Sequence, residues 1–289
     1  MLKLLGFNLK NTSKILPSHY TLYKLGKSYK LIIFKRPVRP GGFEKEEEFR
    51  HEEIEEIKKE LRGQKSFNRL YESISRTKRN VKELALCNEF DYFITLTLNK
   101  DKQDRYNLEE YSKQLSQWIR NLRNRSYQSD IQYLLIPEEH KDGAWHIHGL
   151  IKGIPREQLK LFTVDDDIPQ RMKALIKNGR ILYNWLDYFD RFGFNSLEVI
   201  EDERKISSYI TKYIGKCITT EREGQKKLYY SSRNLKRREL IKQGSIKIYD
   251  QTPDKFDRIP FESLNPYDTE SCLIYDLNEK QLTEIIHSL

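Results

Sequence analysis

Two histidines, His146 and His148, are the side chains in this chain of 289 residues whose type and spacing best suit chemistry. Alternate residues of a β-strand point to the same face, so on a strand both imidazoles would face one point. Imidazole nitrogens bind divalent transition metals, and a nearby carboxylate adds the oxygen ligand that Mg²⁺ and Mn²⁺ prefer. The pattern predicts a metal site on a strand, although a His-x-His pair also occurs on ordinary polar strand faces.

Two glutamates, Glu138 and Glu139, precede the histidines across an Asp-Gly pair that is typical of a tight hairpin turn. A turn of two residues would place Glu139 opposite His146. A turn of three residues would instead place Glu138, together with His140, on the histidine face. Strand geometry alone leaves both registers open.

A candidate nucleophile lies further along the chain, in the segment KISSYITKYIGK. Tyr209 and Tyr213 are four residues apart and would share one helix face, beside Lys212 and Lys216. A phenol has a pKa of about 10 and attacks poorly unless its anion is stabilised, for which a lysine is suited. The alternative is that both aromatic rings only pack beside the apolar stripe of the helix.

The surrounding pattern of strands and helices indicates how these residues are positioned. Alternating or continuous apolar residues predict strands in YFITLTL, IQYLLIP, WHIHGLIKG and FNSLEVI. Helical spacing predicts helices over 108–122, 170–191 and 205–218. The first begins at a capping pair of Asn107 and Glu110, and Gly179 is a candidate break in the second. This order indicates an antiparallel α+β fold rather than a doubly wound parallel sheet.

Three segments in this order, FITLTL, EEHKDGAWHIHG and YITKY, resemble the three motifs of the HUH endonucleases, which initiate rolling-circle DNA replication in phages and plasmids. The resemblance covers about residues 85–220 and is greatest to replication-associated proteins of the filamentous-phage gene II type. It implies an antiparallel sheet of about five strands, similar to an RNA-recognition or ferredoxin-like fold, with the histidines on a central strand.

The resemblance also implies roles for the first two motifs. The ligands of a divalent cation, Mg²⁺ or Mn²⁺, would be His146, His148 and Glu138, which matches the acidic ligand of the family. Thr95 and Thr97 lie in the first motif, which is expected to shape the DNA-binding surface.

The third motif supplies the chemistry that the resemblance implies. Tyr209 would attack a phosphate of single-stranded or hairpin origin DNA, Lys212 would be its basic partner, and Tyr213 matches the second tyrosine of two-tyrosine members. The products would be a 5′-phosphotyrosine and a free 3′-hydroxyl that primes synthesis. A host helicase and polymerase are expected partners, because the sequence contains no GxxxxGK[ST] loop. No small-molecule cofactor is expected.

Two other functions remain open at this point. A transposase of the same chemistry would share every motif and would differ in having terminal hairpins rather than a replication origin beside its coding region. A DNA-binding regulator with a degenerate site would bind DNA without forming a covalent adduct.

The charge distribution favours a polyanionic partner. The formal net charge is +9, and residues 204–247 contain 13 basic and 3 acidic residues, whereas residues 248–289 contain 3 basic and 9 acidic ones. A basic block of this kind is typical of nucleic-acid binding, although a solvated surface is the simpler alternative. The candidate phosphate contacts in it are Lys216, Arg233, Lys236, Arg237 and Arg238.

Composition and breaker residues predict three parts: a helical N-terminal extension over 1–62 (a hairpin and an acidic helix), an endonuclease core over 63–220 with a preceding basic helix, and a C-terminal extension over 221–289. No run of 18 apolar residues occurs, and the three cysteines are far apart. We therefore expect a cytoplasmic protein that does not bind a membrane.

Overall fold

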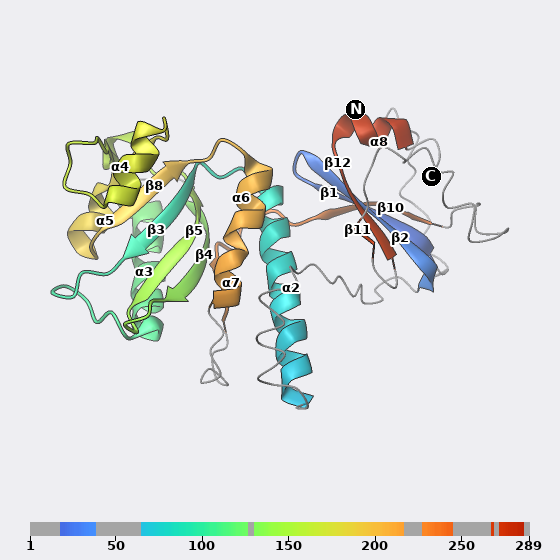
Figure 1. Cartoon of the computed structure of the whole chain (residues 1–289), viewed down its shortest axis with the longest axis horizontal. Coiled ribbons are helices and arrows are strands. Elements are labelled where there is room, and N and C mark those ends of the chain that lie inside the picture. The colour runs from blue at the N-terminus through green and yellow to red at the C-terminus, as the bar shows by residue number, and fades with distance from the viewer. Residues whose placement is uncertain are drawn as a thin grey trace. The chain divides into compact units, whose positions relative to one another are not determined.

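The computed structural model describes residues 18–38, 65–126, 130–216, 227–244, 267–268 and 272–285. The chain forms two compact units (Figure 1). The terminal unit combines residues 1–49 with 238–289, and the core unit contains residues 50–237. No helix of the described residues is long and apolar enough to cross a membrane.

The terminal unit contains an antiparallel sheet of five strands in the order β10-β1-β2-β12-β11. Gly26, at a φ of 58°, turns the chain between β1 and β2, which confirms the predicted N-terminal hairpin. One core of the unit includes Leu22, Leu31, Ile33 and Leu277, all fully buried. The bounds are β1 Ser18–Leu25, β2 Ser28–Val38, β10 Glu239–Gly244, β11 Tyr267–Asp268, β12 Cys272–Leu277 and helix α8 Glu279–Ile285.

The two ends of the chain are therefore parts of one unit, whereas the sequence suggested two separate extensions over 1–62 and 221–289. Strand β2 pairs with β12 through long-range hydrogen bonds, and strand pairing between distant segments has no local sequence signal. The acidic helix predicted within the first extension lies outside the described residues.

The core unit contains an antiparallel sheet of seven strands in the order β6-β7-β8-β3-β5-β4-β9. The predicted antiparallel α+β class is confirmed, and the strands beyond the expected five include the short edge strands β6 and β9. The bounds are β3 Tyr92–Thr97, β4 Gln132–Glu139, β5 Trp145–Lys152, β6 Leu159–Leu161, β7 Leu182–Trp185, β8 Asn195–Val199 and β9 Tyr230–Ser231.

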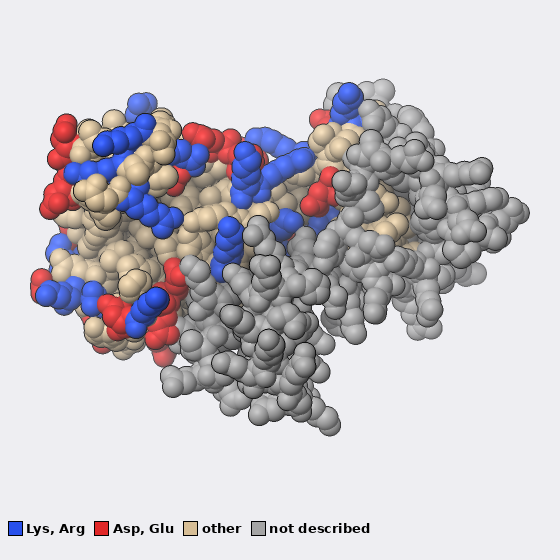
Figure 2. Space-filling model, in the orientation of Figure 1, with Lys and Arg blue, Asp and Glu red and all other residues tan. Residues whose placement is uncertain are grey.

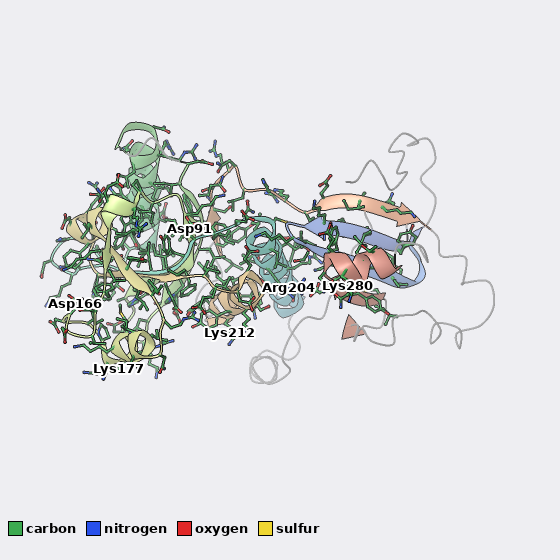
Figure 3. The ribbon with its side chains drawn as sticks, turned by 90° about the horizontal axis from the view of Figure 1, so that it is seen from above. Asp91, Asp166, Lys177, Arg204, Lys212 and Lys280 are labelled. Atoms are coloured by element: carbon green, nitrogen blue, oxygen red, sulfur yellow. The ribbon has the colours of Figure 1, made fainter. Side chains whose placement is uncertain are left out.

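Helices cover both faces of this sheet (Figure 3). Helix α3 (Leu108–Asn121) packs on the face formed by Ile94, Leu96 and their neighbours, and the Asn107 side chain caps it by accepting from the Glu110 amide at 3.0 Å. Helices α2 (Lys65–Cys87), α6 (Glu203–Ile210) and α7 (Lys212–Lys216) pack on the opposite face, which carries Phe93. Alternate side chains of β3 therefore point into two different cores, one on each covered face of the sheet.

The predicted helix over 170–191 is broken at Gly179, as the sequence suggested, but residues 178–185 are not helical. Helix α4 (Gln170–Lys177) ends before Gly179, which has a φ of 83°, and the chain then forms β7 before the short helix α5 (Leu186–Arg191). Glycine at positive φ ends a helix because it has no side chain to clash there. The predicted helix over 205–218 likewise divides at Thr211 into α6 and α7.

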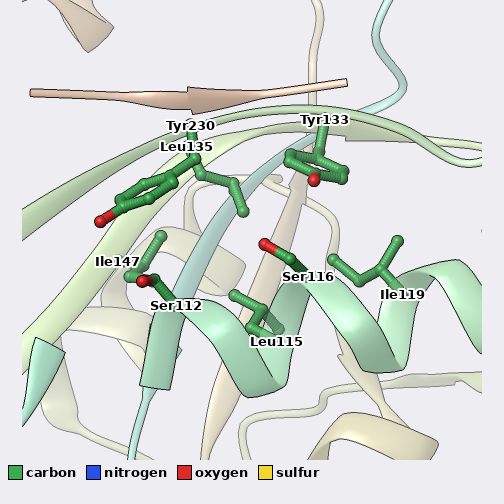
Figure 4. Close-up of a pocket in the computed structure, with 8 residues that line it drawn as sticks. All are labelled: Ser112, Leu115, Ser116, Ile119, Tyr133, Leu135, Ile147 and Tyr230. Carbon is green, nitrogen blue, oxygen red and sulfur yellow. The ribbon is translucent and has the colours of Figure 1, made fainter. Parts of the chain in front are cut away.

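The face under α3 is a packing face. A small cleft between α3 and strands β4 and β5 has room for about one water molecule (Figure 4). It is lined by Ser112, Leu115, Ser116, Ile119, Tyr133, Leu135, Ile147 and Tyr230. A space of that size has no room for a substrate.

Candidate active site

The two histidines lie on β5, between β3 and β4 in the middle of the sheet. His146 is opposite Glu138 of β4, and Glu139 is opposite Trp145, whose side chain belongs to the other face. The His140 amide donates to the Ala144 carbonyl at 2.8 Å and closes a turn of three residues. Of the two registers that the sequence left open, the structure has the one with Glu138 on the histidine face.

Glu138 and His148 are in direct contact. Glu138 Oε2 lies 2.7 Å from His148 Nε2, and the two side chains are only 20% and 12% exposed. The ring of His146 lies 5.3 Å from that of His140, measured between centroids. Within the described part of the chain, no group of three or more His, Cys, Asp or Glu side chains is gathered closely enough to hold a metal ion. The three expected ligands thus share one sheet face without meeting at one point.

The donor chemistry of this face nevertheless suits a divalent cation. Burial, followed by the nearby imidazoles of His148 and His140, lowers the pKa of His146, so this ring is neutral at neutral pH. Neutral imidazole is the form that binds metals. The Nδ1 atoms of His146 and His148 lie 3.1 Å from the hydroxyls of Thr97 and Thr95, respectively. Nε2 is therefore the nitrogen of each ring that can face a metal, and in this structure the Nε2 of His148 contacts Glu138 instead.

The two tyrosines reach this face from the helices above it. The Tyr213 ring stacks on the His148 ring, with 4.0 Å between centroids and 18° between planes. The Tyr213 hydroxyl donates to the Tyr209 hydroxyl at 2.9 Å. Phe93 packs against both phenol rings, with centroids at 5.5 and 6.1 Å. Sequence reasoning assigned Phe93 no part in the site, although strand alternation places it on the same face as Thr95.

The two phenols differ in their surroundings. Burial, followed by the hydrogen bond and the proximity of Tyr209, raises the pKa of Tyr213 well above its usual range, so Tyr213 keeps its proton. The Lys212 ammonium lies 5.1 Å from the Tyr209 ring centroid. Tyr209 is partly exposed, whereas Tyr213 is 8% exposed. Tyr209 is therefore the phenol with a cation beside it and with greater access to solvent.

Tyr209 lies near the end of helix α6, and the position of this helix is set by its first residue. Asp202 caps the helix at that point. The Asp202 carboxylate accepts from the amides of Arg204 and Lys205, both at 3.0 Å. These are donors that the first turn of a helix leaves without an intrahelical acceptor.

The segment that holds these residues runs from β3 to the end of α7. Residues 91–218, called here the replication-associated segment, match the family of replication-associated proteins of the ORF2 and gene II protein type. This match confirms the resemblance to gene II-type replication-associated proteins over that segment, and it supports a role in DNA replication. No curated protein and no solved structure matches the chain.

The replication-associated segment contains every expected ligand and both tyrosines, but most of the expected phosphate contacts lie beyond it. Arg233, Lys236 and Arg237 are exposed in the core unit. Both backbone groups of Lys236 bond to the Asn88 side chain at 2.9 Å, which fixes this stretch at the end of α2.

The predicted basic block does not belong to one unit. Arg238 is part of the terminal unit, where its guanidinium lies 4.1 Å from the centroid of the Tyr23 ring. Lys216 ends α7 within the replication-associated segment, and its side chain lies outside the described residues. The DNA-binding role of these residues remains a prediction.

Proposed function

We propose that this protein is a DNA nicking and joining enzyme that initiates rolling-circle replication. The observation that supports this best is the stacking of Tyr213 on His148, which brings the tyrosine pair to the histidine face although the two motifs are far apart in the chain. A nucleophile beside a candidate cation site, within the replication-associated segment, suits cleavage of a phosphodiester.

Tyr209 carries out the chemical step in this proposal. The Tyr209 hydroxyl loses its proton to solvent, its Oη forms a bond to phosphorus while the bond from phosphorus to the 3′ oxygen breaks, and that oxygen takes up a proton from solvent. The products are a 5′-phosphotyrosine and a free 3′-hydroxyl, which a host polymerase would extend with a host helicase opening the duplex. The intermediate keeps the phosphodiester bond energy, so the reverse reaction joins strands without ATP.

Lys212 and Tyr213 assist Tyr209. The Lys212 ammonium stabilises negative charge on the attacking oxygen, and the Tyr213 hydroxyl donates a hydrogen bond to it. Tyr213 occupies the position of a second nucleophile, and it would have to leave the His148 ring to attack.

His146, His148 and Glu138 would hold Mg²⁺ or Mn²⁺. When bound, such an ion offsets the negative charge that develops on the phosphate oxygens. The chain's own part is to present a neutral His146 and to hold the Glu138 carboxylate on the same face.

A DNA-binding regulator is the second candidate, and one observation favours it. The expected ligands within the described residues are not gathered closely enough for a metal, and Glu138 contacts His148 directly. A transposase would share the whole site and differ only in its DNA target.

Mass spectrometry of the protein after incubation with single-stranded origin DNA and Mn²⁺ tests the proposal. An enzyme gives an oligonucleotide adduct on Tyr209 that Tyr209→Phe loses. Tyr106→Phe is the matched control, because Tyr106 is 60% exposed and lies on neither α6 nor α7. A regulator binds the DNA and gives no adduct. A transposase gives an adduct with the terminal hairpins of its element but not with origin DNA.

A further inference from the structure

Two threonine hydroxyls meet the two imidazoles in matching pairs. Thr95 is directly opposite His148 and Thr97 directly opposite His146 in the antiparallel pairing of β3 with β5. In each pair the threonine Oγ1 lies 3.1 Å from the histidine Nδ1. We propose that Thr95 and Thr97 are positioning residues that orient both imidazoles so that Nε2 faces the cation site. This inference rests on the proposed function.

The spacing of the threonines on β3 matches the spacing of the histidines on β5. Both the threonines and the histidines are two residues apart on adjacent strands, so all four side chains emerge on one face and pair across the gap. The intervening Leu96 and Ile147 point to the other face, where they are 1% exposed in the core under α3. A slip of one residue would remove both hydroxyl–imidazole pairs together, and the buried Leu96 and Ile147 prevent it.

A hydroxyl suits this task because it can donate or accept. It donates to Nδ1 when the ring carries its proton on Nε2, and it accepts from Nδ1–H when Nε2 is free to bind a metal. Metal-bound histidines almost always donate their other ring N–H to an oxygen acceptor, usually a carboxylate, a backbone carbonyl or water, which fixes the tautomer and the ring orientation. Valine has nearly the same shape as threonine and can do neither.

The two pairs are not equivalent. The His148 ring is also held by the Tyr213 ring at 4.0 Å and by the Glu138 carboxylate at 2.7 Å. His146, by contrast, has the Thr97 hydroxyl and the exposed ring of His140 at 5.3 Å. Loss of the Thr97 hydroxyl should therefore weaken metal binding more than loss of the Thr95 hydroxyl.

Mn²⁺ binding to the full chain without DNA, followed by electron paramagnetic resonance, tests the inference. Thr97→Val should weaken the affinity by about 10- to 100-fold, the usual effect of losing an outer partner of a metal ligand, and Thr95→Val by less. The matched controls Thr95→Ser and Thr97→Ser keep the hydroxyl and should stay within about twofold of the wild type. Affinity for single-stranded DNA without metal, measured on the same four variants, separates this role from that of a DNA-binding surface.

Three results would overturn the inference. Valine variants that bind Mn²⁺ as the wild type does would remove the positioning role. Valine variants that keep Mn²⁺ affinity but lose DNA affinity would make the threonines a DNA-contacting surface instead. A wild-type protein that binds no Mn²⁺ would overturn the metal site of the proposed function, and with it this inference.

If the valine variants do not fold, a measurement on the wild-type protein still tests the inference. Long-range ¹⁵N–¹H correlation spectra of the Mg²⁺-loaded protein identify which ring nitrogen of each histidine carries the proton. We expect Nδ1–H in both His146 and His148. A proton on Nε2 of either ring, with Nδ1 facing the metal, would contradict the proposed orientation.

Discussion

The ring of Tyr213 covers the imidazole of His148, with 4.0 Å between their centroids and 18° between their planes. The Glu138 carboxylate contacts the same imidazole, 2.7 Å from its Nε2. One histidine is thus held by a phenol from helix α7 and a carboxylate from strand β4. The two tyrosines therefore differ in role. Tyr213, whose ring covers His148, donates a hydrogen bond, and the Tyr209 hydroxyl accepts it.

Substitution of the two tyrosines should separate these tasks. Tyr209→Phe should abolish the covalent adduct with single-stranded DNA, because the attacking oxygen is lost. Tyr213→Phe should retain the adduct and form it up to about tenfold more slowly, as expected for one lost neutral hydrogen bond. Adduct yield against time, measured by denaturing gel electrophoresis, checks both. An adduct that disappears only in the double variant would instead make both phenols nucleophiles.

His148→Ala should separate DNA binding from cleavage. The variant removes one expected ligand and the stacking partner of Tyr213, but it leaves the basic side chains in place. We expect normal affinity for single-stranded DNA in a filter-binding assay and no nicking with Mn²⁺. Nicking at the wild-type rate would exclude the histidine face from the mechanism.

Arg171 should contribute to DNA binding from the other side of the site. Met172 of helix α4 packs with Leu182 of β7 on the histidine face of the sheet, and the positive charge of Arg171 partly opposes the rise in the pKa of Tyr213. Figure 2 shows Lys and Arg side chains over both α4 and α6.

Arg171→Gln should therefore weaken binding of single-stranded DNA and reduce its salt dependence by about one phosphate contact. Lys177→Gln, at the other end of α4, is the matched control and should have a smaller effect. Fluorescence anisotropy at several salt concentrations checks this. Equal effects of both changes would indicate only a general loss of positive charge.

The buried phenol pair of Tyr111 and Tyr188 should stabilise the core as a unit. Their hydroxyls are 2.6 Å apart under the α3 face, and burial raises the pKa of both. Tyr188→Phe leaves the Tyr111 hydroxyl without this partner and should cost about 1–3 kcal/mol in the free energy of unfolding. The double change to phenylalanine should cost less than the sum of the single changes. Urea unfolding of all four proteins checks this, and additive costs would refute a coupled pair.

Acid should remove the contribution of the Asp202 cap. Backbone hydrogen bonds, the largest from Lys205, lower the pKa of Asp202, so its carboxylate stabilises the folded state above its ordinary pKa of about 4 and loses this effect as the pH falls through the lowered value. Asp202→Ala should lower the melting temperature at pH 7, and the difference from the wild type should shrink with acid. Asp202→Asn, which keeps a capping oxygen, should lower it less. A difference that does not change with pH would contradict the ionic part of the cap.

Features that depend on local periodicity could be predicted from the order of the residues. The His-Ile-His and Thr-Leu-Thr alternations, the helical spacing of Tyr209 and Tyr213 and the cap at Asn107 each depend on residues a few positions apart, where backbone geometry leaves few choices. These patterns were sufficient to predict the antiparallel α+β class and the resemblance to replication-associated proteins.

Contacts between residues far apart in the chain became known from the folded arrangement. The length of one turn selected Glu138 over Glu139, and the pairing of β3 with β5 brought each threonine hydroxyl to an imidazole. Long-range pairing also joined β1 and β2 with β10, β11 and β12 in one sheet, and β7 formed in the middle of the predicted helix over 170–191. Such pairings depend on contacts between segments far apart in the chain, and the free energy of those contacts outweighs local preference.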